Sequence, residues 1–282
     1  MRNLTKSIVI AGLTLAPFSV QAEGLYGYTS LGMTANDVTD DGAAEGTSNG
    51  LKGTGVVGYS FTNGMFFEGE GLVQFASAGP NTPQNNDSLS SGNVLGFRAG
   101  QTFGNASAEL AFGIAQGVTD EGSTDRHYIA LGGGYAFNEQ FSATGLLGYL
   151  DGTGGTDRDG LDGMRQLTHV ALGLEYLATD QLGVNFGAAY GEGIMDNGIP
   201  EDMDVTQVWL GADYAVNDAI DLYGKVSWLE INQAREDDVT QETRVEIGLQ
   251  WTFGATESRP SRTRPDLPDY SDWLALSAGV TE

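Results

Sequence analysis

Charged side chains recur inside short segments in which apolar and polar residues alternate. Those that fall on the polar faces of these segments are Lys52, Glu68, Glu70, Arg98, Glu109, His169, Glu175, Asp213, Asp221, Lys225, Arg244 and Glu246. Successive residues of a strand point to opposite sides of a sheet, so each segment has one apolar and one polar face. Acidic residues outnumber basic ones in this set. If the polar faces enclose water, they favour cations.

A second acidic group lies in the segment 151–163, where aspartates alternate with glycines. Asp157, Asp159 and Asp162 could supply three carboxylates to Ca²⁺, which prefers oxygen ligands. The full EF-hand loop pattern with its closing glutamate is missing. We therefore expect a solvated acidic loop, with a Ca²⁺ site as the alternative. No other cofactor is expected.

Catalytic patterns are weak in this sequence. There is no cysteine, and His127 and His169 are the only histidines. His169 and Glu175 are six residues apart along one strand, about 20 Å at ~3.3 Å per residue, so they cannot form a dyad. No Gly-x-Ser-x-Gly, zinc-binding or phosphate-loop motif occurs. We expect no catalytic residue, and a hydrolase is the least favoured class.

The alternation predicts about twelve strands, each near the length of a tilted membrane strand. They are expected at 24–35, 51–61, 65–77, 92–103, 106–117, 126–137, 141–150, 166–177, 182–192, 204–216, 220–231 and 240–253. No proline falls in these ranges, as sheet hydrogen bonding requires. Short connections rich in Asn and Gly alternate strictly with longer acidic ones. This rhythm is typical of an antiparallel up-and-down transmembrane β-barrel with short periplasmic turns and long extracellular loops.

The N-terminal residues 1–22 have the pattern of a cleaved signal peptide. Arg2 and Lys6 precede an apolar stretch, and the small-residue pattern Val20-Gln21-Ala22 follows it. The stretch is short for a membrane anchor, which is the alternative. The chain carries a formal net charge of −25, which makes nucleic acid an unlikely partner.

The Gly-rich opening 24–32, the hairpin rhythm and the strand 244–253 together resemble the porin-like outer-membrane β-barrels of Gram-negative bacteria. The resemblance covers about residues 1–253 and implies an outer-membrane pore for passive diffusion of small hydrophilic solutes or cations. It also implies contact with lipid and lipopolysaccharide. Trp251 and Phe253 would then form the C-terminal signal that the barrel-assembly machinery recognises. Here, however, residues 254–282 follow that signal.

The segment 254–282 is expected to be a flexible, Pro- and Arg-containing periplasmic tail. The alternative is docking, in which Trp273, Leu274 and Leu276 close the periplasmic mouth or bind a partner. The lumen itself also allows two interpretations. Inward charges on a face rich in glycine and alanine favour a water-filled, cation-preferring pore. If those charges pair with one another, the chain is a non-conducting structural or adhesion barrel that presents acidic loops.

Overall fold

A computed structural model describes residues 24–40, 43–78, 91–118, 123–152, 163–196, 200–234, 238–254 and 265–278 of the protein. The expected signal peptide lies outside these ranges. So does the acidic triad of Asp157, Asp159 and Asp162.

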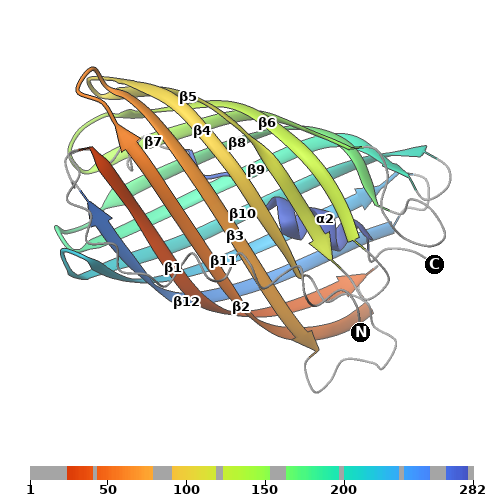
Figure 1. Ribbon diagram of the computed structural model, residues 1–282. Coiled ribbons are helices and arrows are strands. Elements are labelled where there is room, and N and C mark those ends of the chain that lie inside the picture. Colours follow the sequence, from red (N-terminus) through yellow and green to blue (C-terminus); the bar gives the residue numbers. More distant parts are fainter. Residues whose placement is uncertain are drawn as a thin grey trace, which may run out of the picture.

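Twelve antiparallel strands form one closed barrel in sequence order, and the last strand pairs with the first (Figure 1). The strands are β1 (Leu25–Asp40), β2 (Ala43–Ser60), β3 (Met65–Ala78), β4 (Ser91–Phe103), β5 (Ala106–Val118), β6 (Ser123–Ala136), β7 (Phe141–Asp151), β8 (Met164–Leu177), β9 (Leu182–Asp196), β10 (Pro200–Asn217), β11 (Ile220–Gln233) and β12 (Asp238–Gly254). The predicted fold class and strand number are confirmed.

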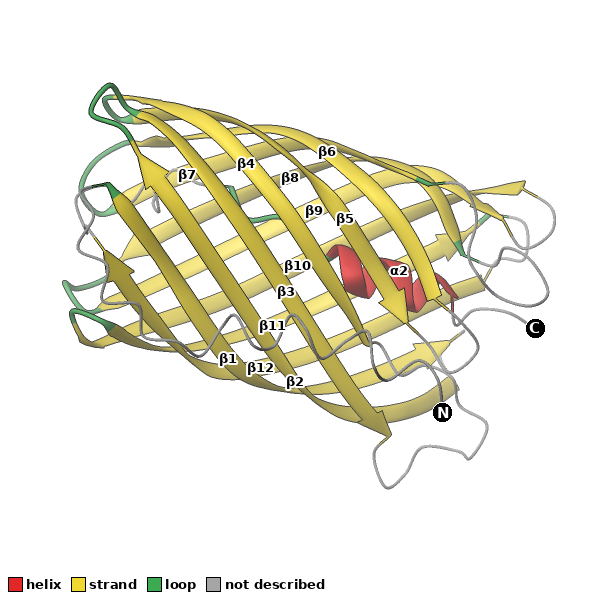
Figure 2. Ribbon diagram, in the orientation of Figure 1, coloured by secondary structure: helices red, strands yellow, loops and turns green. Residues whose placement is uncertain are grey.

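The two ends of the barrel differ in how strands are connected. At one end, here called the short-turn end, hairpins close within a few residues. Asn138 caps one of them by accepting hydrogen bonds from the backbone N–H groups of Gln140 and Phe141, both at 2.8 Å. Gly64 and Gly104 adopt positive φ in two others, as their turns require. The opposite end is called the long-loop end, and the short turns lie at the left of Figure 2.

Strands reach further toward the long-loop end than the alternation predicted. The first two strands were expected to stop at residue 35 and to begin at residue 51, but they extend to Asp40 and from Ala43. Polar residues such as Asn36 continue the ladder there, opposite Ser48 on one side and Arg244 on the other. Where a strand extends beyond the bilayer, its outward face need not be apolar. The alternation of apolar and polar residues is therefore lost there, although the strands remain hydrogen-bonded. Pro200 begins β10, a position that a proline tolerates.

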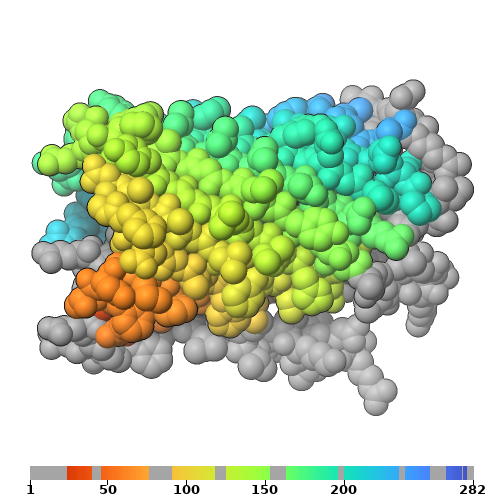
Figure 3. Space-filling model, turned by 90° about the horizontal axis from the view of Figure 1, so that it is seen from above, coloured from red at the N-terminus to blue at the C-terminus, as the bar shows by residue number. Residues whose placement is uncertain are grey.

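The outer face of the barrel is a continuous apolar surface. One row crosses four neighbouring strands, with Leu110 opposite Leu131, Leu131 opposite Leu147, and Leu147 opposite Val170. All four side chains are more than 40% exposed. Figure 3 shows this wall from outside, with the side chains of successive strands packed side by side. Such a surface suits hydrocarbon, because lipid satisfies no polar group.

One helix is described, α2 (Tyr270–Ala278), and it lies inside the barrel (Figure 2). No helix in the described ranges is both long enough and apolar enough to cross a membrane.

The inner face changes character along the barrel. Toward the long-loop end the buried inward side chains of β7–β11 are largely apolar, namely Leu150, Met164, Leu167, Met195, Met203, Val205, Leu229 and Ile231. Those of β12 and β1–β3 at the same end are largely polar, including Asn36, Gln74, Glu242 and Arg244. Toward the short-turn end the inward side chains are largely polar, including Tyr28, Ser30, Ser142, Thr144, Asn185 and Gln250. The hydrophobic core of the molecule therefore lies within one half of the lumen.

A charge placed on the outer face should destabilise the barrel in a bilayer. Leu131 is 62% exposed in the middle of the apolar row. We expect Leu131→Arg to lower the free energy of unfolding by about 2–4 kcal/mol, because the charge would face hydrocarbon. Urea unfolding in lipid vesicles measures this loss. Gln140→Arg adds the same charge in an exposed short turn and should change stability little; an equal loss in both variants would contradict the assignment of the lipid face.

Candidate functional site

The C-terminal segment 265–278 occupies the lumen. Gly254 ends the last strand at the short-turn end, whereas the Ser277 hydroxyl accepts a hydrogen bond, at 3.1 Å, from the backbone N–H of Met164, where β8 begins at the long-loop end. Between them, the carbonyl of Pro265 accepts a hydrogen bond from Arg98 Nη1 at 2.8 Å. The described segment 265–278 thus lies within the lumen and extends to the long-loop end.

This placement corrects the expectation of a flexible periplasmic tail for residues 265–278. Docking was the alternative, and Trp273, Leu274 and Leu276 are indeed buried. The helix, however, lies in the long-loop half of the lumen and not at the short-turn mouth (Figure 1). The physical reason is the apolar inner wall of that half, which needs an apolar filler.

Aromatic contacts anchor α2 to the wall. Tyr270 and Trp273 are fully buried. Their ring centroids lie 5.2 and 5.4 Å from the ring of His169, and Tyr128 lies 5.0 Å from Tyr270. His169 Nε2 also lies 2.8 Å from the Tyr270 hydroxyl. Burial of such rings is a large favourable contribution to docking.

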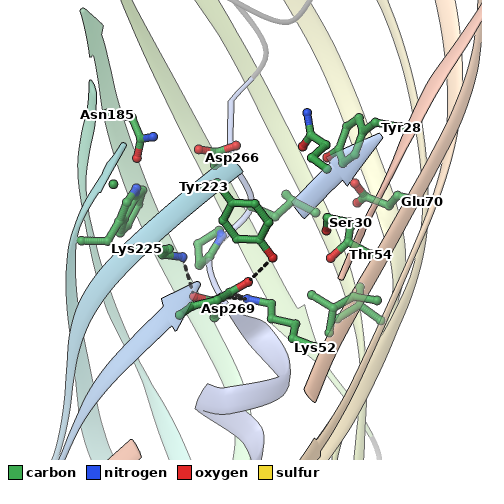
Figure 4. Close-up of a pocket in the computed structure, with 18 of the residues that line it drawn as sticks. Tyr28, Ser30, Lys52, Thr54, Glu70, Asn185, Tyr223, Lys225, Asp266 and Asp269 are labelled. Carbon is green, nitrogen blue, oxygen red and sulfur yellow. Dashed lines mark hydrogen bonds and ion pairs between the residues drawn. The ribbon is translucent and has the colours of Figure 1, made fainter. Parts of the chain in front are cut away.

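A carboxylate at the start of the helix is held by two lysines. Asp269 Oδ1 lies 3.1 Å from Lys52 Nζ, and Oδ2 lies 2.9 Å from Lys225 Nζ (Figure 4). Gln207 Nε2 donates to Oδ2 at 3.2 Å, and Lys52 is shared with Glu246 at 3.2 Å. Both oxygens of Asp269 are therefore satisfied by groups from the barrel wall.

A second carboxylate follows one helical turn later. Asp272 pairs with Arg244 and accepts a hydrogen bond from Gln74 Nε2 at 3.0 Å. Arg244 also pairs with Glu242 at 2.7 Å and donates to Asn36 Oδ1 at 3.1 Å. Every group in this cluster is buried. Buried pairs of this kind are costly to break, because removal of one partner leaves an unpaired charge.

Burial alone would raise the pKa of the Asp269 carboxyl, but Lys225, Lys52 and Arg244 together hold it well below its ordinary value of 3.8. Asp269 is therefore ionised when docked. Because the docked pKa is the lower one, its contribution to docking is complete above pH 3.8 and is lost as pH falls through the docked pKa.

A separate cluster surrounds Arg98. Its guanidinium pairs with Glu109 and, at 3.3 Å, with Glu70, in addition to the Pro265 carbonyl. The hydroxyl of Tyr128 donates to Glu70 at 3.1 Å. Arg98 therefore links wall acids to the incoming tail.

The remaining predicted residues lie nearer the short-turn end. Glu175 accepts a hydrogen bond from Ser142 at 3.2 Å, and Asp221 accepts one from Gln250 at 3.4 Å. Asp213 lines the same space. Glu68 is buried and accepts a hydrogen bond from Tyr26 at 2.9 Å. All eleven predicted lining residues thus face the lumen, but several of the charged ones contact one another or the tail.

A polar chamber fills the short-turn half of the lumen. It consists of a cavity of about 270 Å³ beside Asp269 and a second of about 400 Å³ further toward the short turns. The two share lining residues, including Asn185, Trp209 and Tyr223. Their walls hold seven acidic and three basic side chains, namely Glu70, Glu175, Asp213, Asp221, Glu246, Asp266 and Asp269 against Lys52, Arg98 and Lys225.

Several lining residues were not predicted as site residues. Gln74 and Gln207 bind the tail carboxylates, and Trp209 lies under Lys225, whose Nζ is 5.5 Å from the ring centroid. The alternation predicts that these three side chains face the lumen. What they bind there depends on the position of the tail, which the alternation does not predict.

Two other sites were predicted, a Ca²⁺ site and the C-terminal assembly signal. No cluster of metal-ligating side chains occurs among the described residues, and the proposed Ca²⁺ ligands lie outside them. Trp251 is 42% exposed at the short-turn end of β12, and Phe253 follows it there. Their recognition by the assembly machinery stays a prediction.

Comparison with solved structures finds this fold in outer-membrane proteins. The COG4313 outer membrane channel from Pseudomonas putida F1 aligns with a TM-score of 0.60 and 11% identity, over 85% of this chain and 100% of that one. The Pseudomonas putida toluene transporter TodX aligns with a TM-score of 0.47 and 10% identity, over 86% and 91%. The KdgM porin aligns with a TM-score of 0.43 and 16% identity, over 79% and 99%. No protein-family model and no curated protein sequence matches the chain. The chain has the porin-like barrel fold.

Loss of the Trp273 ring should release the helix. The chain has no cysteine, so Ser277→Cys provides a unique thiol at a fully buried position. In that background we expect Trp273→Ala to cost about 3–5 kcal/mol of docking. At ~1.4 kcal/mol per tenfold change, thiol labelling should accelerate roughly 10²- to 4 × 10³-fold. Phe112→Ala, on the outer face, should leave the labelling rate unchanged; equal acceleration in both variants would contradict the docked position.

Acid should release the helix only well below neutral pH. The difference in fluorescence between the natural chain and Trp273→Phe isolates the emission of Trp273. We expect that emission to be constant from about pH 8 to 5 and to shift to the red only below pH 3.8, as Asp269 takes up a proton. Asp269→Asn should remove this acid step. A step of the same size in Asp269→Asn would assign it to another group.

Proposed function

We propose that the chain is an outer-membrane channel for small hydrophilic solutes. The observation that carries the proposal is a polar chamber enclosed by a barrel whose outer face is apolar. An apolar exterior around a polar interior is the arrangement that a bilayer-spanning pore requires. The fold match to a solved outer-membrane channel supports both transport and this location.

The helix determines when such a channel conducts. In the long-loop half, α2 packs against the apolar wall through Tyr270, Trp273 and Leu274, which are fully buried. The polar groups on the other wall of that half, such as Gln74 and Arg244, are engaged by Asp272 of the tail. We infer that passage requires the helix to leave this position, so the docked state is the closed or low-conductance state.

Cation preference is the finer part of the proposal. Acidic side chains outnumber basic ones around the chamber, and the basic ones form ion pairs with neighbouring acids. Glu175, Asp213 and Asp221 line the cavity toward the short turns, and no Lys or Arg of the described residues lines it with them. Their field favours cations in the chamber.

The competing function is a non-conducting structural barrel. The packed long-loop half favours it, because an apolar core fills that part of the lumen. The two functions differ in what happens when the helix is released. A channel should conduct after Trp273→Ala, whereas a structural barrel should stay silent.

Single-channel recording in planar bilayers under a salt gradient tests the proposal. We expect small or rare conductance steps from the natural chain and larger, frequent steps from Trp273→Ala. The reversal potential should be cation-biased and should move toward zero in Glu175→Gln/Asp213→Asn/Asp221→Asn. The exposed turn variant Asp180→Asn/Asp218→Asn should keep the bias. Silence of a folded Trp273→Ala barrel would refute the channel function.

A further inference from the structure

The wall groups that hold the tail carboxylates form a site in their own right. We propose that this site binds small dicarboxylate solutes and that Asp269 and Asp272 of the chain's own tail occupy it in this structure. The inference rests on the proposed channel function for its physiological meaning, but the binding itself is independent of conduction.

The first half of the site is built for a carboxylate. Lys52 on β2 contacts one oxygen of Asp269 at 3.1 Å, and Lys225 on β11 contacts the other at 2.9 Å. Gln207 on β10 adds an amide donor at 3.2 Å. Three donors from three strands of a rigid barrel converge on one carboxylate. Preorganised donors of this kind bind anions strongly where water is excluded.

Lys225 depends on the tail for its counter-charge. Within the described part of the chain its ion pair is with Asp269 alone, whereas Lys52 also pairs with Glu246. When the tail leaves, Lys225 therefore loses its counter-charge beside a wall that still holds Lys52. An ammonium left partly buried without its counter-charge favours the binding of an anion.

The second half of the site fixes the spacing of the ligand. Arg244 and Gln74 bind Asp272, three residues after Asp269. Residues three apart on a helix have Cβ atoms about 5–6 Å apart on one face. The two carboxylate positions are thus separated by the length of a short carbon chain. A five- or six-carbon dicarboxylate fits this spacing, whereas a monocarboxylate engages only one half.

The first half of the site is reachable from the chamber. Lys52, Gln207 and Lys225 line the cavity of about 270 Å³ (Figure 4). That cavity joins the larger one toward the short turns through shared lining residues. A solute that enters from the short-turn side would therefore meet Lys52 and Lys225 as it reaches α2.

The tail is covalently linked to the barrel, and this link determines the concentration at which a free solute can compete with the tail carboxylates. A segment linked to its site by a short connection has an effective concentration in the millimolar range. The apolar anchors add to this advantage. Free dicarboxylate should therefore bind weakly to the natural chain and better to a chain whose tail carboxylates are neutral.

The direct test uses the full chain with Asp269→Asn/Asp272→Asn, refolded in detergent, and calorimetric titration with glutarate. We expect saturable binding that is several times tighter than in the natural chain, and none with the neutral analogue glutaramide. Adding Lys225→Gln should weaken the glutarate binding severalfold. The charge-matched Asp180→Asn/Asp218→Asn chain should behave as the natural one. Absence of binding in a folded Asp269→Asn/Asp272→Asn barrel, or insensitivity to Lys225→Gln, would overturn the proposal.

A second measurement leaves the site intact and covers the case in which that variant does not fold. In the chain with Ser277→Cys, millimolar glutarate should accelerate thiol labelling, because it displaces the tail. Glutaramide, and sodium chloride at matched ionic strength, should not. Equal effects of glutarate and sodium chloride would overturn the site. If glutarate binds but Trp273→Ala never conducts, the channel function fails and the dicarboxylate site stands.

Discussion

A bilayer leaves no backbone N–H or C=O group unpaired, and this constraint shapes the whole chain. A sheet satisfies it only when its first and last strands meet, as β1 and β12 do from Tyr26 opposite Gly254 to Asp40 opposite Thr240. Closure then divides every strand into an outward and an inward set of side chains. The outward set must be apolar. The inward set is free to vary, so the differences between the two halves of the lumen carry the function.

In the long-loop half of the lumen, the strands alone leave apolar surface uncovered. One part of its inner wall, with side chains such as Leu167, Met203 and Ile231, is apolar and would face water in an empty barrel. Trp273 and Leu274 of the tail cover this surface and are themselves fully buried. Hydrophobic burial supplies affinity, and the ion pairs of the two tail carboxylates determine the register at which the helix stops. Docking is therefore strong and also specific.

The strands, their faces and the inward charges could be predicted from the sequence because period 2 is a local signal. The position of the helix is not local. A signal did exist: alternation breaks where two large apolar residues are adjacent, as at Leu146-Leu147 and Trp209-Leu210, so both faces are apolar there. The tail segment 270–277 has apolar residues at helical spacing. Neither observation says that one packs against the other, because that depends on where the closed barrel leaves space.

The charge balance of the lumen shows why site residues are harder to predict than faces. Acidic residues outnumber basic ones among the predicted inward residues of the wall. Beside α2, however, the wall holds three basic side chains, Lys52, Lys225 and Arg244, and two acidic ones, Glu242 and Glu246. The tail adds two carboxylates to this region and makes it net acidic. The wall beside α2 is thus net acidic while the tail is docked and net basic once it has left, whereas Glu175, Asp213 and Asp221 keep the short-turn chamber acidic in both states. Selectivity in this barrel is consequently a property of the tail position as much as of the wall.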